Sequence, residues 1–167
     1  MEAILGKLLR RQVKKRLTTG VFSGTIYTMK PTLKFGTPNA KLKKMAKRLG
    51  VRLSTFTLPA GYTCPGAKDC QSFANRMTGK ITDGKETLFR CFAASAEAVY
   101  PSLRKMVWHN FELIRAALDI GMLDCARLIQ DSLPKKFDVL RVHVGGDYFS
   151  EEYLQAWIYV AMQNPDK

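Results

Sequence analysis

Residues 58–91 read LPAGYTCPGAKDCQSFANRMTGKITDGKETLFRC and carry three of the four cysteines in the chain. The segment before them, VRLSTFTL at residues 51–58, favours a β-strand because it is rich in β-branched and apolar residues. Pro59 and Gly61 end that strand. The stretch therefore predicts a cysteine-bearing site on a loop at the end of a strand.

Downstream of this loop, helical and strand patterns alternate. The apolar spacing over 95–119 predicts a long helix, in which Pro101 marks a first turn or a kink. FDVLRVHV at 137–144 predicts a buried strand that ends in the turn Gly145-Gly146-Asp147. Further expected elements are helical turns at 71–78, a strand or buried segment at 87–92, and helices at 122–133 and 151–163, the last capped by Ser150.

This order predicts an α/β fold, either an open parallel sheet or a partial (β/α) barrel, over residues 51–167. A complete barrel takes about 250 residues, more than the chain has. The final residues 164–167 have the character of a loop leaving a helix. We therefore expect either a truncated chain or an exposed sheet edge at which a partner or a second copy binds.

Residues 1–50 form a basic arm, for which we expect a helix at 3–17, a short hairpin at 21–29 and a helix at 39–49. The arm has thirteen Lys and Arg against one acid, so it carries +12 of the net charge of +13. Such asymmetry indicates either a polyanionic partner, which is nucleic acid or an acidic surface, or a solvated, solubilising tail. The candidate phosphate-contacting residues are Lys7, Arg10, Arg11, Lys14, Lys15, Lys41, Lys43, Lys44, Lys47 and Arg48.

The cysteine spacing leaves three interpretations open. Cys64 and Cys70 flank Pro65-Gly66, and Cys91 lies in a distant segment. The three cysteines are either metal ligands or buried thiols, or they include a redox pair. Three thiolates suit an iron–sulfur cluster with an open iron, or a zinc ion that needs a fourth donor. The candidate fourth donors are Asp69, His109, His143 and Asp147. Cys125 lies on the apolar face of its helix and is expected to be a core thiol.

Glycines and a histidine lie at the end of the 137–144 strand. Carboxyl ends of parallel strands share one edge of a sheet, so Cys64 and Gly145–Asp147 are expected to meet there. His143, Gly145, Gly146 and Asp147 are accordingly candidate cofactor-binding residues. The common nucleotide-binding and hydrolase motifs are absent from the sequence. No secretory signal or membrane-spanning stretch occurs either, although the basic, amphipathic start resembles a transit peptide without the usual serines.

Three segments resemble one family. LPAGYTCPGAKDC, LFRCFAASAEAVYPSLRKMVWHNFELI and LRVHVGGDYFSEEYLQAW are similar to the bacteriophage gene product eighty-eight family, over about residues 41–167. The resemblance implies a viral protein in the cytoplasm of the infected host cell, and a chain that continues beyond residue 167. It implies no activity.

The cysteine loop and the Gly-Gly-Asp strand end also resemble radical S-adenosylmethionine enzymes. That resemblance implies that Cys64, Cys70 and Cys91 ligate a four-iron cluster and that Gly145, Gly146 and Asp147 face the cofactor. The spacing here is C-x5-C-x20-C instead of C-x3-C-x2-C. The resemblance therefore supports a cluster more strongly than it supports cofactor cleavage.

Overall fold

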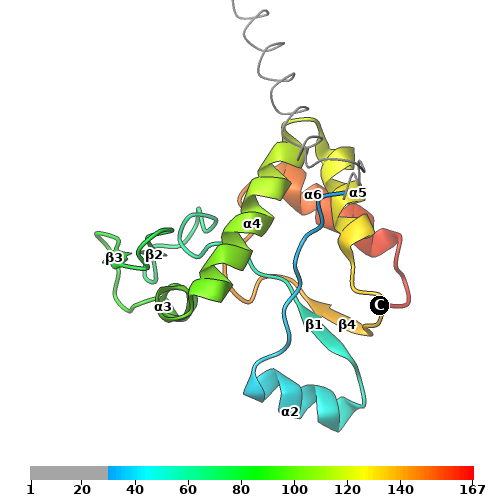
Figure 1. Cartoon of the computed structure of the whole chain (residues 1–167), viewed down its shortest axis with the longest axis horizontal. Helices are drawn as coiled ribbons and strands as arrows, with labels where there is room; N and C mark the ends of the chain where they lie inside the picture. The colour runs from blue at the N-terminus through cyan, green and yellow to red at the C-terminus, as the bar shows by residue number, and fades with distance from the viewer. Residues whose placement is uncertain (1–29) are drawn as a thin grey trace, which may run out of the picture. The chain divides into compact units, whose positions relative to one another are not determined.

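The structure, a computed structural model, describes residues 30–167 (Figure 1). The predicted helix at 3–17, the predicted hairpin at 21–29 and the basic residues Lys7 to Lys15 lie outside them. Residues Leu33–Lys167 form one compact unit. Its helices are α2 (Ala40–Leu49), α3 (Phe92–Val99), α4 (Pro101–Leu118), α5 (Met122–Ser132) and α6 (Glu151–Met162), and its strands are β1 (Leu53–Thr55), β2 (Ser72–Ala74), β3 (Ile81–Asp83) and β4 (Val139–Arg141).

Strands β1 and β4 pair in parallel, with Leu53 opposite Val139. Hydrogen bonding continues beyond both strands, because Val144 N donates to Phe56 O (3.1 Å) and Leu58 N donates to Gly145 O (3.0 Å). The predicted parallel pairing is confirmed. The loops that follow the carboxyl ends of both strands therefore lie at the same edge of the sheet.

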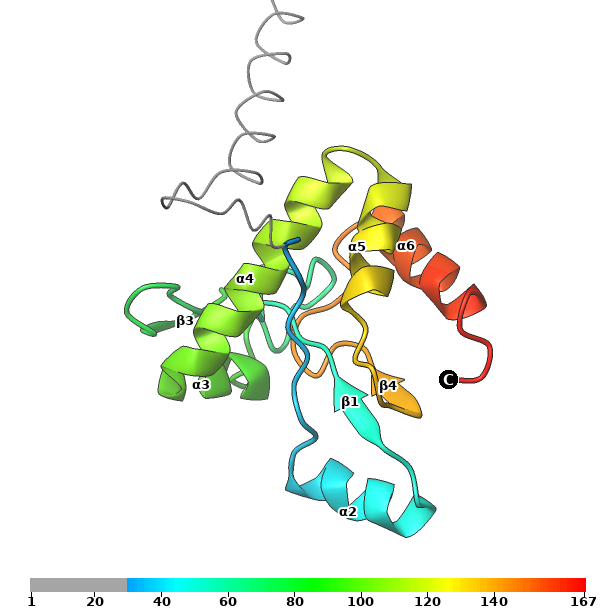
Figure 2. The same ribbon diagram turned by 45° about the vertical axis from the view of Figure 1, so that its right-hand side comes forward.

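Helices α4, α5 and α6 pack against one another (Figure 2), and their buried side chains share one core with Phe56 and Leu58, which follow β1, and with Leu140 of β4. The core centres on Phe56 and Leu58, which are completely buried. Phe56 stacks edge-on against Trp157 of α6, with 5.3 Å between ring centroids. The other fully buried large side chains of this core are Ile114, Ile129, Tyr153 and Cys125.

Local signals account for the helix boundaries. The Asn39 side chain accepts a hydrogen bond from Leu42 N, and Gly50 ends α2 with a left-handed φ of 67°. Ser150 caps α6 by accepting from Tyr153 N. The predicted 95–119 helix is two helices, because Tyr100 is extended and Pro101 starts α4.

Two expectations in the cysteine region are wrong. Residues 72–74 are strand β2, paired antiparallel with β3, where helical turns were predicted. The Asn75 side chain accepts from Met77 N and Thr78 N, so it stabilises a turn instead of a helix. Residues 87–92, expected to be a strand or a buried segment, are neither, because residues 88–89 form an exposed bend in which Leu88 N and Phe89 N both donate to Asp69 O.

The described part of the chain, residues 30–167, forms two two-stranded sheets and contains no barrel. The mixed α/β class is correct, whereas a barrel is not found. The predicted strands at 51–58 and 137–144 pair over only three residues each. Within 30–167, none of the helices combines the length and the apolar character needed to cross a bilayer.

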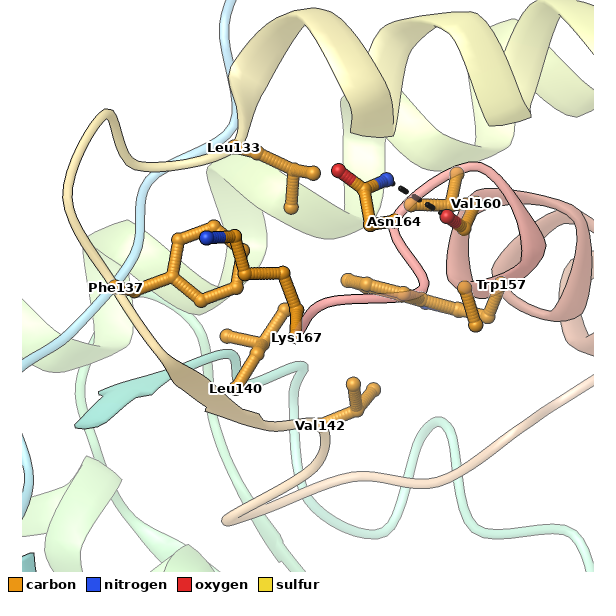
Figure 3. A pocket seen from close by; sticks show the side chains of 9 residues that line it. Leu133, Phe137, Leu140, Val142, Trp157, Val160, Asn164 and Lys167 are labelled. Atoms are coloured by element: carbon orange, nitrogen blue, oxygen red, sulfur yellow. Dashed lines mark hydrogen bonds between the residues drawn. The ribbon is translucent and has the colours of Figure 1, made fainter. Parts of the chain in front are cut away.

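An apolar groove of about 160 Å³ lies beside β4 (Figure 3). Leu140 and Val142 line one wall of the groove and Trp157 lines the other. Within residues 30–167, β4 pairs with β1 alone, so its other edge has no strand neighbour there. That a partner or a second copy covers this edge stays a prediction.

Candidate functional site

The loop that carries Cys64 packs against the Gly145-Gly146-Asp147 turn. Leu58 N donates to Gly145 O (3.0 Å), and Asp147 N donates to the Thr63 hydroxyl (3.3 Å). Thr63 is fully buried, and its hydroxyl also donates to Pro59 O (2.9 Å). The expectation that these two segments meet at the strand ends is confirmed.

Both glycines are needed for this close approach. Gly146 has a left-handed φ of 78°, and a Cβ there would lie 2.5 Å from the Thr63 hydroxyl oxygen. A Cβ on Gly145 would lie 2.6 Å from Cβ of Ala93, in the first turn of α3. The turn therefore brings three segments together: the cysteine loop, the β4 end and the start of α3.

Cys91 lies at the amino end of α3. It occupies the N-cap position, and its backbone N–H donates to the Ser72 hydroxyl (3.1 Å) on β2. Ser95 Oγ donates back to Cys91 O (3.0 Å). The β2–β3 hairpin and α3 thus fix the backbone of Cys91 from both sides.

The three cysteines are free, half-buried and electrostatically coupled. Burial raises the pKa of the Cys64 thiol, and negative charge on Asp147, Cys91 and Cys70 raises this pKa further, although a backbone hydrogen bond at Gly61 lowers it. Cys64 is therefore the thiol that senses Asp147 and both other loop cysteines. Within residues 30–167, however, no three His, Cys, Asp or Glu side chains are arranged as a group that could hold a metal ion.

The four candidate fourth donors occupy different environments. Asp147 is exposed and lies close enough to Cys64 to affect its pKa. Asp69 is exposed in the cysteine loop, between Cys64 and Cys70 in the sequence. His109 lies on α4 and lines a separate cleft with Arg76 and Trp108. Asp147 is the donor that the electrostatics link to the Cys64 thiol.

His143 lies in an aromatic cluster behind the turn. Its Nε2 lies 3.0 Å from the Tyr153 hydroxyl, and its ring packs edge-on against Tyr148 at 4.5 Å. Burial lowers the pKa of His143 to about 4, and the charge of Asp147 partly opposes this effect. With a φ of 59°, His143 is held in the left-handed region, which is unusual for a non-glycine residue. Its role in binding a cofactor stays a prediction.

Cys125 is completely buried on α5, as expected for a core thiol, and burial raises its pKa to about 12. It stands apart from the half-buried thiols of the loop.

On α2, Leu42 and Ala46 face inward, and the predicted phosphate-contacting residues of that helix are exposed. These exposed residues are Lys41, Lys43, Lys44, Lys47 and Arg48.

The buried polar residues include Glu97, Arg104 and Asn110. The sequence pattern places Asn110 on the apolar face of the long helix but does not single out Glu97 or Arg104. Glu97 Oε1 accepts from Ala60 N (2.8 Å), so it anchors the start of the cysteine loop. Asn110 bonds the N–H and the C=O of Lys34, each at 2.8 Å. A single acid in the apolar run FAASAEAV was the available signal for Glu97.

The fold and site define a mixed α/β protein in which loop cysteines gather beside a glycine turn at the ends of parallel strands. The chain belongs to the Gene product 88 family, whose model matches residues 30–167. The chain is 28% identical to the Gene 88 protein of Mycobacterium phage L5 over 127 residues, which cover 68% of this chain and 44% of that protein. It is 26% identical to the Gene 88 protein of Mycobacterium phage D29 over 121 residues, or 64% and 41%.

The first family resemblance seen in the sequence is therefore confirmed. The chain spans less than half the length of these curated phage relatives. No solved structure matches it. The comparisons give no support to the resemblance to radical S-adenosylmethionine enzymes.

Proposed function

We propose that this phage protein binds an iron–sulfur cluster through Cys64, Cys70 and Cys91, with zinc as the alternative metal. The observation that carries the proposal is the convergence of three segments that hold free, half-buried thiols: Cys64 follows Thr63, which accepts from Asp147 N, Cys70 follows Asp69, whose C=O accepts from Leu88 N and Phe89 N, and Cys91 N donates to Ser72. Gathering groups whose negative charges oppose one another is unfavourable, and a bound cation offsets that cost. Soft thiolates are the ligands that iron–sulfur clusters and zinc prefer.

A cluster is the first candidate because three thiolates leave one of its irons open, whereas zinc needs a fourth donor. The ligands of a cluster are spread over several iron atoms, so they lie further apart than ligands around one ion. As placed, no three His, Cys, Asp or Glu side chains within residues 30–167 form a group that could hold a metal ion. Binding requires the three cysteine side chains to turn toward one another. The proposal ends at binding, because nothing supports a radical reaction.

The test is anaerobic purification of the full chain, followed by iron, sulfide and zinc analysis and a visible absorption spectrum. Single Cys64→Ser, Cys70→Ser and Cys91→Ser variants are each expected to lose most of the metal. Cys125→Ala is the matched control, because its thiol lies in the core and its loss leaves the cluster ligands intact. A folded, metal-free protein with four titratable thiols would refute the proposal.

A second candidate function is nucleic-acid binding through α2. The helix presents five exposed basic residues, and it contains no acid. Neutralising phosphates releases counterions, so the logarithm of the binding constant falls by about 0.9 per contact with the logarithm of salt concentration. Action in the cytoplasm of the infected host cell fits both candidate functions.

This candidate predicts salt-dependent binding of a labelled oligonucleotide, measured by fluorescence anisotropy. Replacing four lysines of α2 by glutamine (Lys41, Lys43, Lys44 and Lys47) should weaken binding and reduce the salt slope. A matched control replaces four exposed lysines elsewhere (Lys68, Lys85, Lys105 and Lys136), which changes the net charge equally. Equal losses in both variants would show a net-charge effect and reject α2 as the binding surface.

A further inference from the structure

A cleft that Gly145 also lines is a second candidate site. This half-open cleft of about 470 Å³ is bounded by the segment before α2, the end of β1, and helices α3 and α4. Its volume falls within the range of roughly 300–1,000 Å³ that is usual for small-molecule sites. Like the cysteine site, it lies where β1 and β4 end, because Thr55, Thr57, Val144 and Gly145 all line it. None of the four cysteines lines it.

Glu97 is the one charged side chain among the residues that line this cleft. Its exposed fraction is 1%, and Oε1 accepts from Ala60 N (2.8 Å). Within residues 30–167, Oε2 has no hydrogen-bond partner. A buried carboxyl oxygen without a partner is costly, so its presence beside a cleft needs an explanation.

The nearby cation does not satisfy Oε2. Arg104 is buried, but its guanidinium donates to three backbone carbonyls: those of Glu97 (2.5 Å), Ala98 (3.3 Å) and Arg76 (3.0 Å). It thereby ties α3 to the turn before β3. Glu97 therefore lines the cleft with a carboxyl that has no hydrogen-bonded counter-ion.

The remainder of the cleft is largely apolar. Phe92 and Tyr100 are exposed. Leu103, Met106 and Val144 extend the apolar surface. A single acidic group in such a wall selects a ligand with an apolar body and a cationic head, and it disfavours anions. We propose that this cleft binds a small organic amine whose protonated nitrogen donates to Glu97 and whose apolar part packs against α3 and α4.

The probe is 2-phenylethylamine, titrated into the isotopically labelled full chain while amide chemical shifts are recorded at pH 7.5. Its matched comparison is 2-phenylethanol, which has nearly the same shape but no charge. We expect the amine to bind about tenfold more tightly than the alcohol, because a charged hydrogen bond to a carboxylate is stronger than a neutral one. The shifts should centre on α3 and Gly145.

Two variants make the test specific. Glu97→Gln keeps an oxygen for Ala60 N–H and should abolish the preference for the amine while still binding the alcohol. Ala96→Leu fills the cleft and should weaken both ligands, whereas Val99→Leu, at an exposed position of α3 outside the cleft, should weaken neither. Equal affinity for the two probes, absence of binding, shifts centred elsewhere, or an unchanged preference in Glu97→Gln would each overturn the proposal.

Discussion

The buried carboxyl of Glu97 predicts a pH-dependent stability that a single substitution removes. Burial raises the pKa of Glu97 from 4.5 to about 7, against smaller opposing effects of the Ala60 N–H and the Arg104 charge. Because the folded protein holds this proton more tightly than the unfolded chain, the stabilisation is fully present below about pH 4.5. It is lost as the pH rises through about 7.

The size of the effect follows from the two pKa values. At about 1.36 kcal/mol per pKa unit, the full difference amounts to about 3.4 kcal/mol, of which about 2.5 kcal/mol develops between pH 8 and pH 5. Glu97→Gln has no proton to exchange, so it lacks this contribution. The difference in unfolding free energy between the variant and the parent should therefore change by about 2.5 kcal/mol over this range.

The assay is urea unfolding of the parent and of Glu97→Gln at pH 5 and at pH 8, followed by circular dichroism. Differences between the two proteins are compared because other groups also titrate. His143 acts in the opposite direction: its pKa is lowered to about 4 by burial, so its contribution falls as the pH drops below about 6.5. That contribution is common to both proteins and cancels. If the difference in unfolding free energy between the variant and the parent changed by less than about 0.5 kcal/mol from pH 5 to pH 8, the reasoning about Glu97 would be refuted.

Three further predictions test other parts of the structure. Gly146→Ala should destabilise by about 2–4 kcal/mol in urea unfolding, because its φ is left-handed and the new Cβ would meet the Thr63 hydroxyl; a loss below about 1 kcal/mol would contradict the close approach. Asn110→Ala should cost about 3 kcal/mol by calorimetry, since the N–H and C=O of Lys34 lose their partner; a neutral result would show that water replaces the amide. In the metal-free protein, iodoacetamide should modify Cys64, Cys70 and Cys91 but reach Cys125 only on unfolding, as read by mass spectrometry; rapid native labelling of Cys125 would contradict its burial.

Elements with local signals were predictable from the sequence. The cap residues Asn39 and Ser150 and the stop at Gly50 fix α2 and α6 close to their expected bounds. The parallel pairing of β1 and β4 followed from the alternation of strands and helices. For the same reason the meeting of Cys64 with Gly145–Asp147 was correctly predicted, because strand topology alone places both at one edge.

The errors arose where tertiary contacts outweigh local preference. Ser72–Ala74 is a strand because Asn75 and Gly79 shape the turn that pairs it with β3, a feature that periodicity does not encode. Glu97 was overlooked because one acid in a helix is ordinarily solvent-exposed. Its burial depends on Ala60, which lies 37 residues earlier in the sequence. Such long-range partners cannot be derived from spacing within a single segment.

The two proposed sites share the segment that leads out of β1. Two of its hydrogen bonds reach the glycine turn: Leu58 N donates to Gly145 O, and the Thr63 hydroxyl accepts from Asp147 N. A third reaches α3, because Ala60 N donates to Glu97 Oε1. Cys64 follows Thr63 directly. The acceptor at Glu97 therefore helps to set the position of the cysteine loop, as well as the charge of the cleft. Glu97→Ala, which removes that acceptor, should perturb both sites, whereas Glu97→Gln retains the acceptor and should alter the cleft alone.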